Sequence, residues 1–277
     1  MNNKEIKKVV REGYAKVAKQ DSSCCTSKCS CCGDTVNTES ISKRIGYTEE
    51  ELTSVPEGAN LGLGCGNPVA IASLKEGETV LDLGSGPGFD CFLAAKKVGK
   101  NGRVIGIDMT PEMIKKAKEN AKKGNYQNVE FKLGEIENLP VGDNSVDIII
   151  SNCVINLSPD KDKVFKEAFR VLKPGGRIMI SDIVLLKALP DAVKESVEAN
   201  IGCLAGAMMK PDYIKTIEAV GFKEVKIIDE TFFPVEFMTN DPAVQTIIKN
   251  LNISIEEIKA LANSAVSIKV YGIKPNN

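Results

Sequence analysis

The chain has 277 residues, 43% of them hydrophobic, and its acidic and basic side chains nearly balance at a formal net charge of −1. A chain of this length and composition can bury a large core, so it does not need the disulfide framework of a small secreted domain. The balanced charge, with no basic stripe among aromatic residues, excludes nucleic acid as an expected partner. The chain has no histidine, which excludes every catalytic arrangement with a histidine base.

The start of the chain shows no leader or membrane segment. Residues 1–8 lead into a charged amphipathic stretch, and no apolar run approaches the roughly 18 to 20 residues that span a bilayer. We therefore expect a soluble, cytoplasmic protein that has no membrane partner and keeps its cysteines reduced.

The first twenty residues are predicted to form an amphipathic helix, because apolar side chains recur at spacings of three and four. A small, polar segment without periodicity follows. Five of the nine cysteines of the chain lie in it, namely Cys24, Cys25, Cys29, Cys31 and Cys32. We expect residues 1–44 to form an N-terminal helix and cysteine-rich segment, ahead of a domain that spans residues 45–277.

From residue 79 onward, short apolar runs alternate with helical stretches. The strand-like runs are TVLDLG, RVIGID, VEFKLG, VDIIISN and RIMISDI, and the helix-like stretches between them are GFDCFLAAKKVG, TPEMIKKAKENAKKG and DKDKVFKEAFRVLKPGG. Strict alternation of this kind predicts an α/β fold, a doubly wound and mostly parallel sheet of the Rossmann-like type with helices on both faces.

The end of the chain departs from this alternation. Two late strand candidates, VGFKEVKIIDE and AVSIKVYGIKP, are separated by an insertion at about residues 231–262, which predicts antiparallel final strands. The stretch 184–219 is rich in helix formers, and we expect it to cover the carboxyl edge of the sheet, where ligands bind in such folds.

The motif VLDLGSGPGFD places Gly84, Gly86 and Gly88 between a strand and a helix, where the backbone must approach a ligand closely. The dinucleotide fingerprint requires a small residue at the position of Phe89, so this loop is not of that type. Such a loop alone is also compatible with a phosphate-binding or purely architectural domain.

The loop, with Asp82 two residues upstream, resembles motif I of class I S-adenosylmethionine methyltransferases. Further motifs of that family follow in order. Asp108 ends the second strand, where a carboxylate can accept hydrogen bonds from both ribose hydroxyls, and LGEIENLP and RVLKPGG come after it. The resemblance implies S-adenosylmethionine as the cofactor. The cofactor-binding residues expected from it are Asp82, Gly84, Gly86, Gly88, Asp108, Met109, Glu135, Ile136 and Asn152.

Three further cysteines stand at unusual places. Cys65 lies in the glycine-rich NLGLGCGNP, Cys153 follows the fourth strand in SNCVINLS, and Cys203 lies in ANIGCLAGAM. With these motifs the sequence resembles the arsenite S-adenosylmethionine methyltransferases over nearly its whole length. The resemblance implies trivalent arsenic bound by the thiolates of Cys65, Cys153 and Cys203, with an N-terminal cysteine that we assign to Cys32, although Cys31 fits the family's position equally well.

The chemistry of trivalent arsenic agrees with this residue set. Arsenic is soft and prefers thiolate to oxygen, and three sulfurs leave its lone pair available as the nucleophile, so no general base is needed. The expected substrates are arsenite and methylarsenite. Methylation oxidises arsenic, and thiols that reduce it again form a disulfide, which implies an external reductant such as thioredoxin or glutathione.

Other interpretations remain open at this level. The same fold could serve a C- or O-methyltransferase of a small organic molecule, or a cysteine-based metalloid-binding sensor. The N-terminal cysteines could deliver arsenite, supply a fourth thiol or act as a separate metal buffer, although their spacing does not match a zinc knuckle. Cys91, on the helix after the glycine loop, is expected to serve packing, with a redox role as the alternative.

Overall fold

The computed structural model describes residues 2–19, 38–189, 206–232 and 264–276, and every structural statement here concerns these ranges. The five N-terminal cysteines, Cys203 and most of the expected insertion at 231–262 lie outside the described residues. The roles of Cys32 and Cys203 in arsenic chemistry therefore remain predictions from the sequence.

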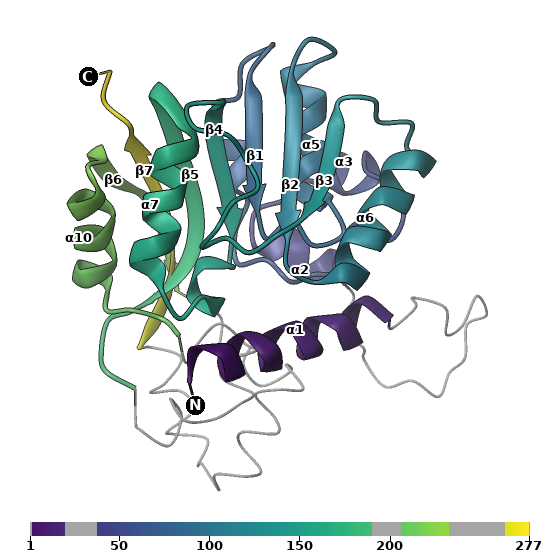
Figure 1. Ribbon diagram of the computed structural model, residues 1–277. Coiled ribbons are helices and arrows are strands. Elements are labelled where there is room, and N and C mark those ends of the chain that lie inside the picture. Colours follow the sequence, from purple (N-terminus) through teal and green to yellow (C-terminus); the bar gives the residue numbers. More distant parts are fainter. Residues whose placement is uncertain (1, 20–37, 190–205, 233–263, 277) are drawn as a thin grey trace, which may run out of the picture.

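A single seven-stranded sheet forms the centre of the described chain (Figure 1). Its order is β3-β2-β1-β4-β5-β7-β6, with the first five strands parallel and β7 antiparallel to both of its neighbours. The strands are β1 (Thr79–Leu83), β2 (Arg103–Asp108), β3 (Val129–Leu133), β4 (Val146–Asn152), β5 (Leu172–Leu185), β6 (Lys223–Phe232) and β7 (Ala265–Ile273). This confirms the predicted doubly wound, mostly parallel sheet with antiparallel final strands.

Helices cover both faces of the sheet (Figure 1). One face packs against α4 (Pro68–Ile71), α5 (Phe89–Val98) and α6 (Pro111–Lys123), and the other against α7 (Lys161–Val171) and α10 (Lys210–Val220). The remaining elements are α1 (Asn3–Lys19), α2 (Thr38–Arg44), α3 (Glu49–Thr53) and the short 3₁₀ helix η1 (Ile155–Leu157).

The central strands divide their side chains between two cores. In β1, Val80 packs on the side of α5 and α6, whereas Leu81 packs on the side of α7 and α10. Ile148 and Ile149 of β4 divide in the same way. Successive side chains of a strand point to opposite faces, so a strand covered on both sides is apolar at every position. This is why the central runs lack polar alternation.

The boundary between α7 and β5 differs from the sequence-based prediction. The helix-like stretch 160–176 was expected to remain helical through the motif RVLKPGG, but α7 ends at Val171 and β5 begins at Leu172. Leu172 pairs with Val146 of β4, and Pro174 cannot continue a helix because its ring clashes with the preceding turn. Pairing in the sheet thus determines where α7 ends, which the local periodicity of the sequence did not indicate.

The stretch 184–219, expected to cover the carboxyl edge, is divided between several elements. Val184 and Leu185 close β5, residues 190–205 lie outside the described chain, and residues 210–219 belong to α10. Tyr213 and Ile217 of α10 pack into the core that α7 shares, on the face of the sheet.

Among the described elements, α1 crosses the carboxyl edge, below the strands in Figure 1. Val10 of α1 is fully buried in a cluster with Cys65, Cys153 and Leu157, and Lys19 pairs with Glu112 of α6 at 3.0 Å. The predicted N-terminal helix therefore packs onto the sheet domain. No helix of the described ranges is long and apolar enough to cross a membrane.

Candidate active site

A pocket opens at the carboxyl edge, between the loops that follow β1, β2 and β4 and the side of α1 that faces the sheet. Seven of the predicted cofactor-binding residues line it, namely Asp82, Gly84, Gly86, Asp108, Met109, Ile136 and Asn152. Cys153 also lines it, and α1 contributes Lys7, Val10 and Tyr14. Gly88 and Glu135 lie next to this set in the chain but are not among the lining residues. The structure thus gathers most of the predicted residues in one place.

The glycine loop has the backbone conformation that glycine favours. Gly84 has φ +69° and Gly86 has φ +50°. A Cβ atom on Gly84 would lie 2.2 Å from Cγ2 of Val154, whereas one on Gly86 would meet nothing within 4 Å and would stand in the pocket. Close packing therefore requires Gly84, and Gly86 keeps open the space in which a ligand can approach the backbone.

Asp108 holds this loop in shape from the end of β2. Its Oδ2 accepts the backbone N–H of Gly86 at 2.9 Å, and its Oδ1 accepts that of Thr110 at 2.8 Å. Burial raises the pKa of Asp108, while these two backbone hydrogen bonds favour the ionised form and oppose the shift. The carboxylate both shapes the loop and presents negative charge to the pocket.

A buried polar network lies on the opposite wall. Tyr47 donates its hydroxyl to Asp90 Oδ1 at 2.6 Å, and Asn152 Nδ2 donates to Asp90 Oδ2 at 3.1 Å. Burial raises the pKa of Asp90 to about 6 and, together with the charge of Asp90, raises that of Asp82 well above its usual range. Sequence reasoning missed both residues: Tyr47 lies in no motif that the resemblance used, and Asp90, which ends the motif VLDLGSGPGFD, was given no role.

Lys7 of α1 closes the acidic side of the pocket. Its Nζ lies 2.7 Å from Oε2 of Glu135 and 3.0 Å from Oε1 of Glu137. Glu137 is buried and also accepts the hydroxyl of Ser158 at 2.6 Å, whereas Glu135 remains half-exposed. Burial lowers the pKa of Lys7, but the two carboxylates outweigh it and raise the pKa overall. No local sequence pattern indicated this contact, since its partners lie 128 residues apart.

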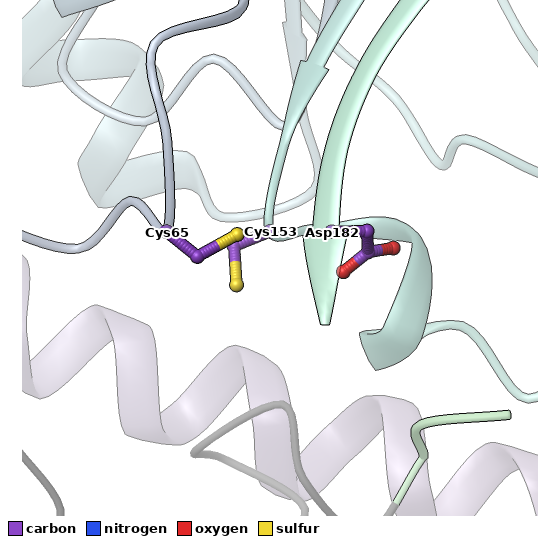
Figure 2. A group of neighbouring side chains, drawn as sticks. All are labelled: Cys65, Cys153 and Asp182. Atoms are coloured by element: carbon purple, nitrogen blue, oxygen red, sulfur yellow. The ribbon is translucent and has the colours of Figure 1, made fainter. Parts of the chain in front are cut away.

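At the pocket wall, two of the predicted substrate thiols meet. Figure 2 shows Cys65 and Cys153 side by side, with Asp182 next to them. The sulfur atoms and a carboxylate oxygen of Asp182 all lie within 4.8 Å of one another, and all three residues are buried. Cys65 comes from the loop before α4, Cys153 from the turn after β4 and Asp182 from β5. The sheet brings together what the sequence keeps far apart.

The backbone fixes both thiols. Cys65 donates its N–H to Oδ1 of Asn152 at 3.0 Å, and its carbonyl accepts the hydroxyl of Ser267 at 2.8 Å. Cys153 has φ +60°, a left-handed conformation that a non-glycine residue rarely adopts, and donates its N–H to the carbonyl of Ser181 at 2.8 Å. Such conformations cluster at functional sites.

Asp182 was not predicted from the sequence. Its Oδ1 accepts Nδ2 of Asn156 at 2.8 Å and the N–H of Ile183 at 3.0 Å, and its Oδ2 accepts the hydroxyl of Tyr213 at 3.0 Å. Complete burial raises the pKa of Asp182 to about 7 against the opposing effect of these hydrogen bonds. A single carboxylate within the apolar strand RIMISDIVL was the available signal, because a buried charge is costly unless it has a role.

Cys91 does not belong to this group. It is buried on α5, and its Sγ donates to Oδ2 of Asp82 at 3.2 Å. Burial, with the neighbouring charge of Asp82, raises the pKa of the Cys91 thiol well above its usual range, so the protonated form is favoured. Its surroundings agree with the expected packing role.

Known proteins resemble this chain in sequence and fold. Residues 74–231 match the methyltransferase domain family. The crystal structure of an arsenic(III) S-adenosylmethionine methyltransferase from Chlamydomonas reinhardtii superposes with a TM-score of 0.60 at 32% identity, over 85% of this chain and 73% of that one. The chain belongs to the arsenite methyltransferase family. Its fold is accordingly that of the S-adenosylmethionine-dependent methyltransferases.

Curated members of the arsenite methyltransferase family are longer than this chain. The arsenite methyltransferase of Halobacterium salinarum is 50% identical over 230 residues, which cover 80% of this chain and 59% of that protein. The human arsenite methyltransferase is 33% identical over 246 residues, with 85% and 63% covered. The chain thus spans about three fifths of the curated relatives that it matches here.

Proposed function

We propose that this protein transfers methyl groups from S-adenosylmethionine to trivalent arsenic held by cysteine thiolates. The observation that carries the proposal is the pair of buried thiols, Cys65 and Cys153, that converge beside a pocket lined by the methyltransferase motif residues. The arsenite methyltransferases of Halobacterium salinarum and human, to which the chain is related, support the same substrate. The activity serves the detoxification of arsenic.

The pocket fits S-adenosylmethionine in its shape and its polar groups. Open space at Gly86 admits a ligand against the backbone, and Asp108 offers a carboxylate to the ribose hydroxyls. Ser85 lines the pocket, and its buried hydroxyl has no hydrogen-bond partner among the described residues. A buried polar atom of this kind favours a polar ligand.

In the proposed reaction the protein acts by binding and orientation. Cys65, Cys153 and Cys203 displace the hydroxides of arsenite, whose oxygens leave as water with the thiol protons. Arsenic bound by three sulfurs keeps its lone pair, and S-adenosylmethionine bound in the pocket would supply the electrophilic methyl group for that pair, with its sulfonium sulfur leaving as the thioether. No proton leaves the attacking atom, so a histidine-free site suffices. Asp108 presents a carboxylate to the pocket, and negative charge there favours a sulfonium.

Turnover requires reduction, because the new arsenic–carbon bond removes two electrons from arsenic. Two thiolates return them by leaving arsenic as a disulfide, and Cys32 is the N-terminal thiol that we assign to this stage. An external reductant, either a dithiol of the thioredoxin type or a thiol of the glutathione type, then reduces the disulfide. Such a cycle suits the reducing cytoplasm.

The proposal is tested by incubating the purified protein with arsenite, isotopically labelled S-adenosylmethionine and a thiol reductant. Mass spectrometry should show labelled methylarsenicals that depend on all three components. Omission of the reductant should stop the reaction after about one turnover. Transfer of the label to no arsenical under any of these conditions would overturn the proposal.

A further inference from the structure

One polar group beside the thiol pair has no part in the reaction proposed above. Asp182 is fully buried, and one of its carboxylate oxygens lies within 4.8 Å of both Cys65 Sγ and Cys153 Sγ (Figure 2). Trivalent arsenic is satisfied by sulfur and gains little from a carboxylate. Two thiols with one carboxylate form instead a mixed donor set, and mixed sulfur and oxygen sets suit borderline and soft divalent cations.

The spacing of these three groups is close to that of a metal site. In a tetrahedral Zn²⁺ site, bonds of about 2.3 Å to sulfur and about 2.0 Å to oxygen place the ligand atoms roughly 3.5 to 3.8 Å apart. The three atoms here lie within 4.8 Å of one another, so a cation would have to draw them together by up to about 1 Å. Hydrogen bonds to Asn152 and Ser181 fix the backbones of the two cysteines, so this approach would come from their side chains.

The surroundings of Asp182 are those of an oriented ligand. Its carboxylate accepts three hydrogen bonds, from Asn156, Tyr213 and the backbone of Ile183. A carboxylate has about four lone-pair positions, so one remains for a cation. Partners of this kind fix the direction of a metal ligand and are characteristic of metal sites.

A second observation at the same place points to a bound ligand. Oδ1 of Asn156 is buried and has no hydrogen-bond partner among the described residues, while its Nδ2 donates to Asp182 and to the carbonyl of Ile183. A buried acceptor without a donor is costly, and an ordered water often fills that role. A water that completes the coordination of a cation would supply the missing donor.

We propose that Cys65, Cys153 and Asp182 bind a thiophilic divalent cation of the Zn²⁺ and Cd²⁺ class, with a water or a further thiol as the fourth ligand. Binding releases the two thiol protons to solvent and leaves the oxidation state of the cation unchanged. Because the cation uses both substrate thiols, it competes with trivalent arsenic. Substitution of Asp182 distinguishes cation binding from arsenic binding, because its carboxylate binds the cation and not arsenic.

The test is a titration with Zn²⁺ and with Cd²⁺ of the 277-residue chain in which the five N-terminal cysteines are serine, which removes competing thiols. Isothermal calorimetry and competition with a chromophoric chelator should give one tight site. Asp182→Asn should weaken it at least tenfold, and Cys153→Ser should abolish it. Cys91→Ser, which removes an equally buried thiol outside the group, is the matched control and should leave the affinity unchanged.

Folding of each variant is checked by thermal unfolding, and Tyr213→Phe provides a variant that keeps the carboxylate but releases one of its hydrogen bonds. It should weaken cation binding less than Asp182→Asn. The site would be overturned if folded Asp182→Asn bound Zn²⁺ and Cd²⁺ as tightly as the parent does. Loss of cation binding in Cys91→Ser would also overturn it. Absorbance of the cadmium–thiolate bond gives a readout that requires no catalysis.

Competition is measured by adding arsenite to the cadmium-loaded protein and following release of the cation. Arsenite should displace the cation. Displacement from Asp182→Asn should require a lower arsenite concentration than displacement from the parent. Methylation without cation binding would reject the cation site alone. Cation binding without methylation of arsenic would reject the proposed function and leave the cation site in place.

Discussion

The side-chain oxygen of Asn152 accepts the backbone N–H of Cys65 at 3.0 Å. Asn152 is the last residue of β4, and its Nδ2 also donates to the hydroxyl of Tyr47 at 2.9 Å and to the carbonyl of Gly66 at 2.8 Å. One amide thus ties the loop that carries Cys65, a proposed substrate thiol, to the wall of the proposed cofactor pocket. Cys65 is held by this contact and by the hydroxyl of Ser267, because its loop has no helix or strand to hold it at that point.

We therefore expect Asn152→Ala to weaken arsenite binding by about tenfold or more, since buried groups left without partners cost roughly 1–3 kcal/mol. Calorimetric titration with arsenite measures the effect, and titration with S-adenosylmethionine tests the separate prediction that Asn152 contacts the cofactor. Asn128→Ala, which removes hydrogen bonds to the end of α5, is the control. Unchanged arsenite affinity in Asn152→Ala would show that the loop holds Cys65 by itself.

Alanine at two positions of the glycine loop should affect different properties, stability in one case and cofactor affinity in the other. Gly84→Ala places a Cβ against Val154, so we expect the melting temperature to fall by several degrees. Gly86→Ala meets nothing within 4 Å, so only the strain of its left-handed backbone, about 1 kcal/mol, affects stability. Its methyl group stands in the pocket and should weaken S-adenosylmethionine binding more than tenfold. Thermal unfolding and calorimetry on both variants separate the two effects.

Asp108→Ala should reduce both cofactor affinity and stability. The variant loses the ligand-facing carboxylate together with the two hydrogen bonds that it accepts from Gly86 and Thr110. Hydrogen bonds to charged groups contribute about 1.5–3 kcal/mol each, so S-adenosylmethionine affinity should fall at least tenfold. Arsenite binding, which depends on the thiols, should remain. Normal cofactor affinity in calorimetry would mean that the carboxylate only shapes the loop.

Serine at Cys65 or Cys153 should lower the rate of the first methylation by orders of magnitude. The hydroxyl has nearly the volume of the thiol but is hard and protonated, so arsenic loses a sulfur ligand and its orientation toward the methyl group. The double variant should be hardly slower than either single variant, because residues that act as one unit are not additive. Single-turnover rates with saturating arsenite measure this, and near-normal rates would reject thiolate coordination at the pair.

The stability of the protein should depend on pH through Asp90. Burial raises the pKa of Asp90 from 3.8 to about 6, so the folded state binds this proton more tightly than the unfolded chain does. Its contribution to the free energy of unfolding is therefore most favourable below about pH 4 and is lost as the pH rises toward 6, by at most about 3 kcal/mol.

Asp90→Asn removes this titration, so the decrease in unfolding free energy between about pH 4 and about pH 6 should become smaller. Part of the decrease should remain, because the pKa of Asp82 is also raised by burial. Urea unfolding at both pH values measures the difference, and Asp147→Asn, at a partly exposed carboxylate paired with Lys173, serves as the control. An unchanged pH dependence in Asp90→Asn would place the titrating group elsewhere.

Local patterns in the sequence determined the parts of this protein that depend on neighbouring residues. The apolar runs predicted β1 to β4 almost to the residue, because strands buried on both faces have few polar positions. The spacing of Gly84, Gly86 and Gly88 located the turn between β1 and α5, where positive φ values exclude most side chains. Cys153 could be placed at the carboxyl edge because it follows a parallel strand.

The tertiary structure alone decided which of these residues meet. Cys65, Cys153 and Asp182 become neighbours because β4 and β5 pair in parallel and the loop before α4 returns to their ends. The helix α1 covers this edge through contacts such as Lys7 with Glu135, between residues 128 positions apart. Periodicity reports which face of an element is apolar and contains no information on its partner. That choice follows from strand order and packing over the whole chain, which is why Asp182 and the position of α1 were not predicted.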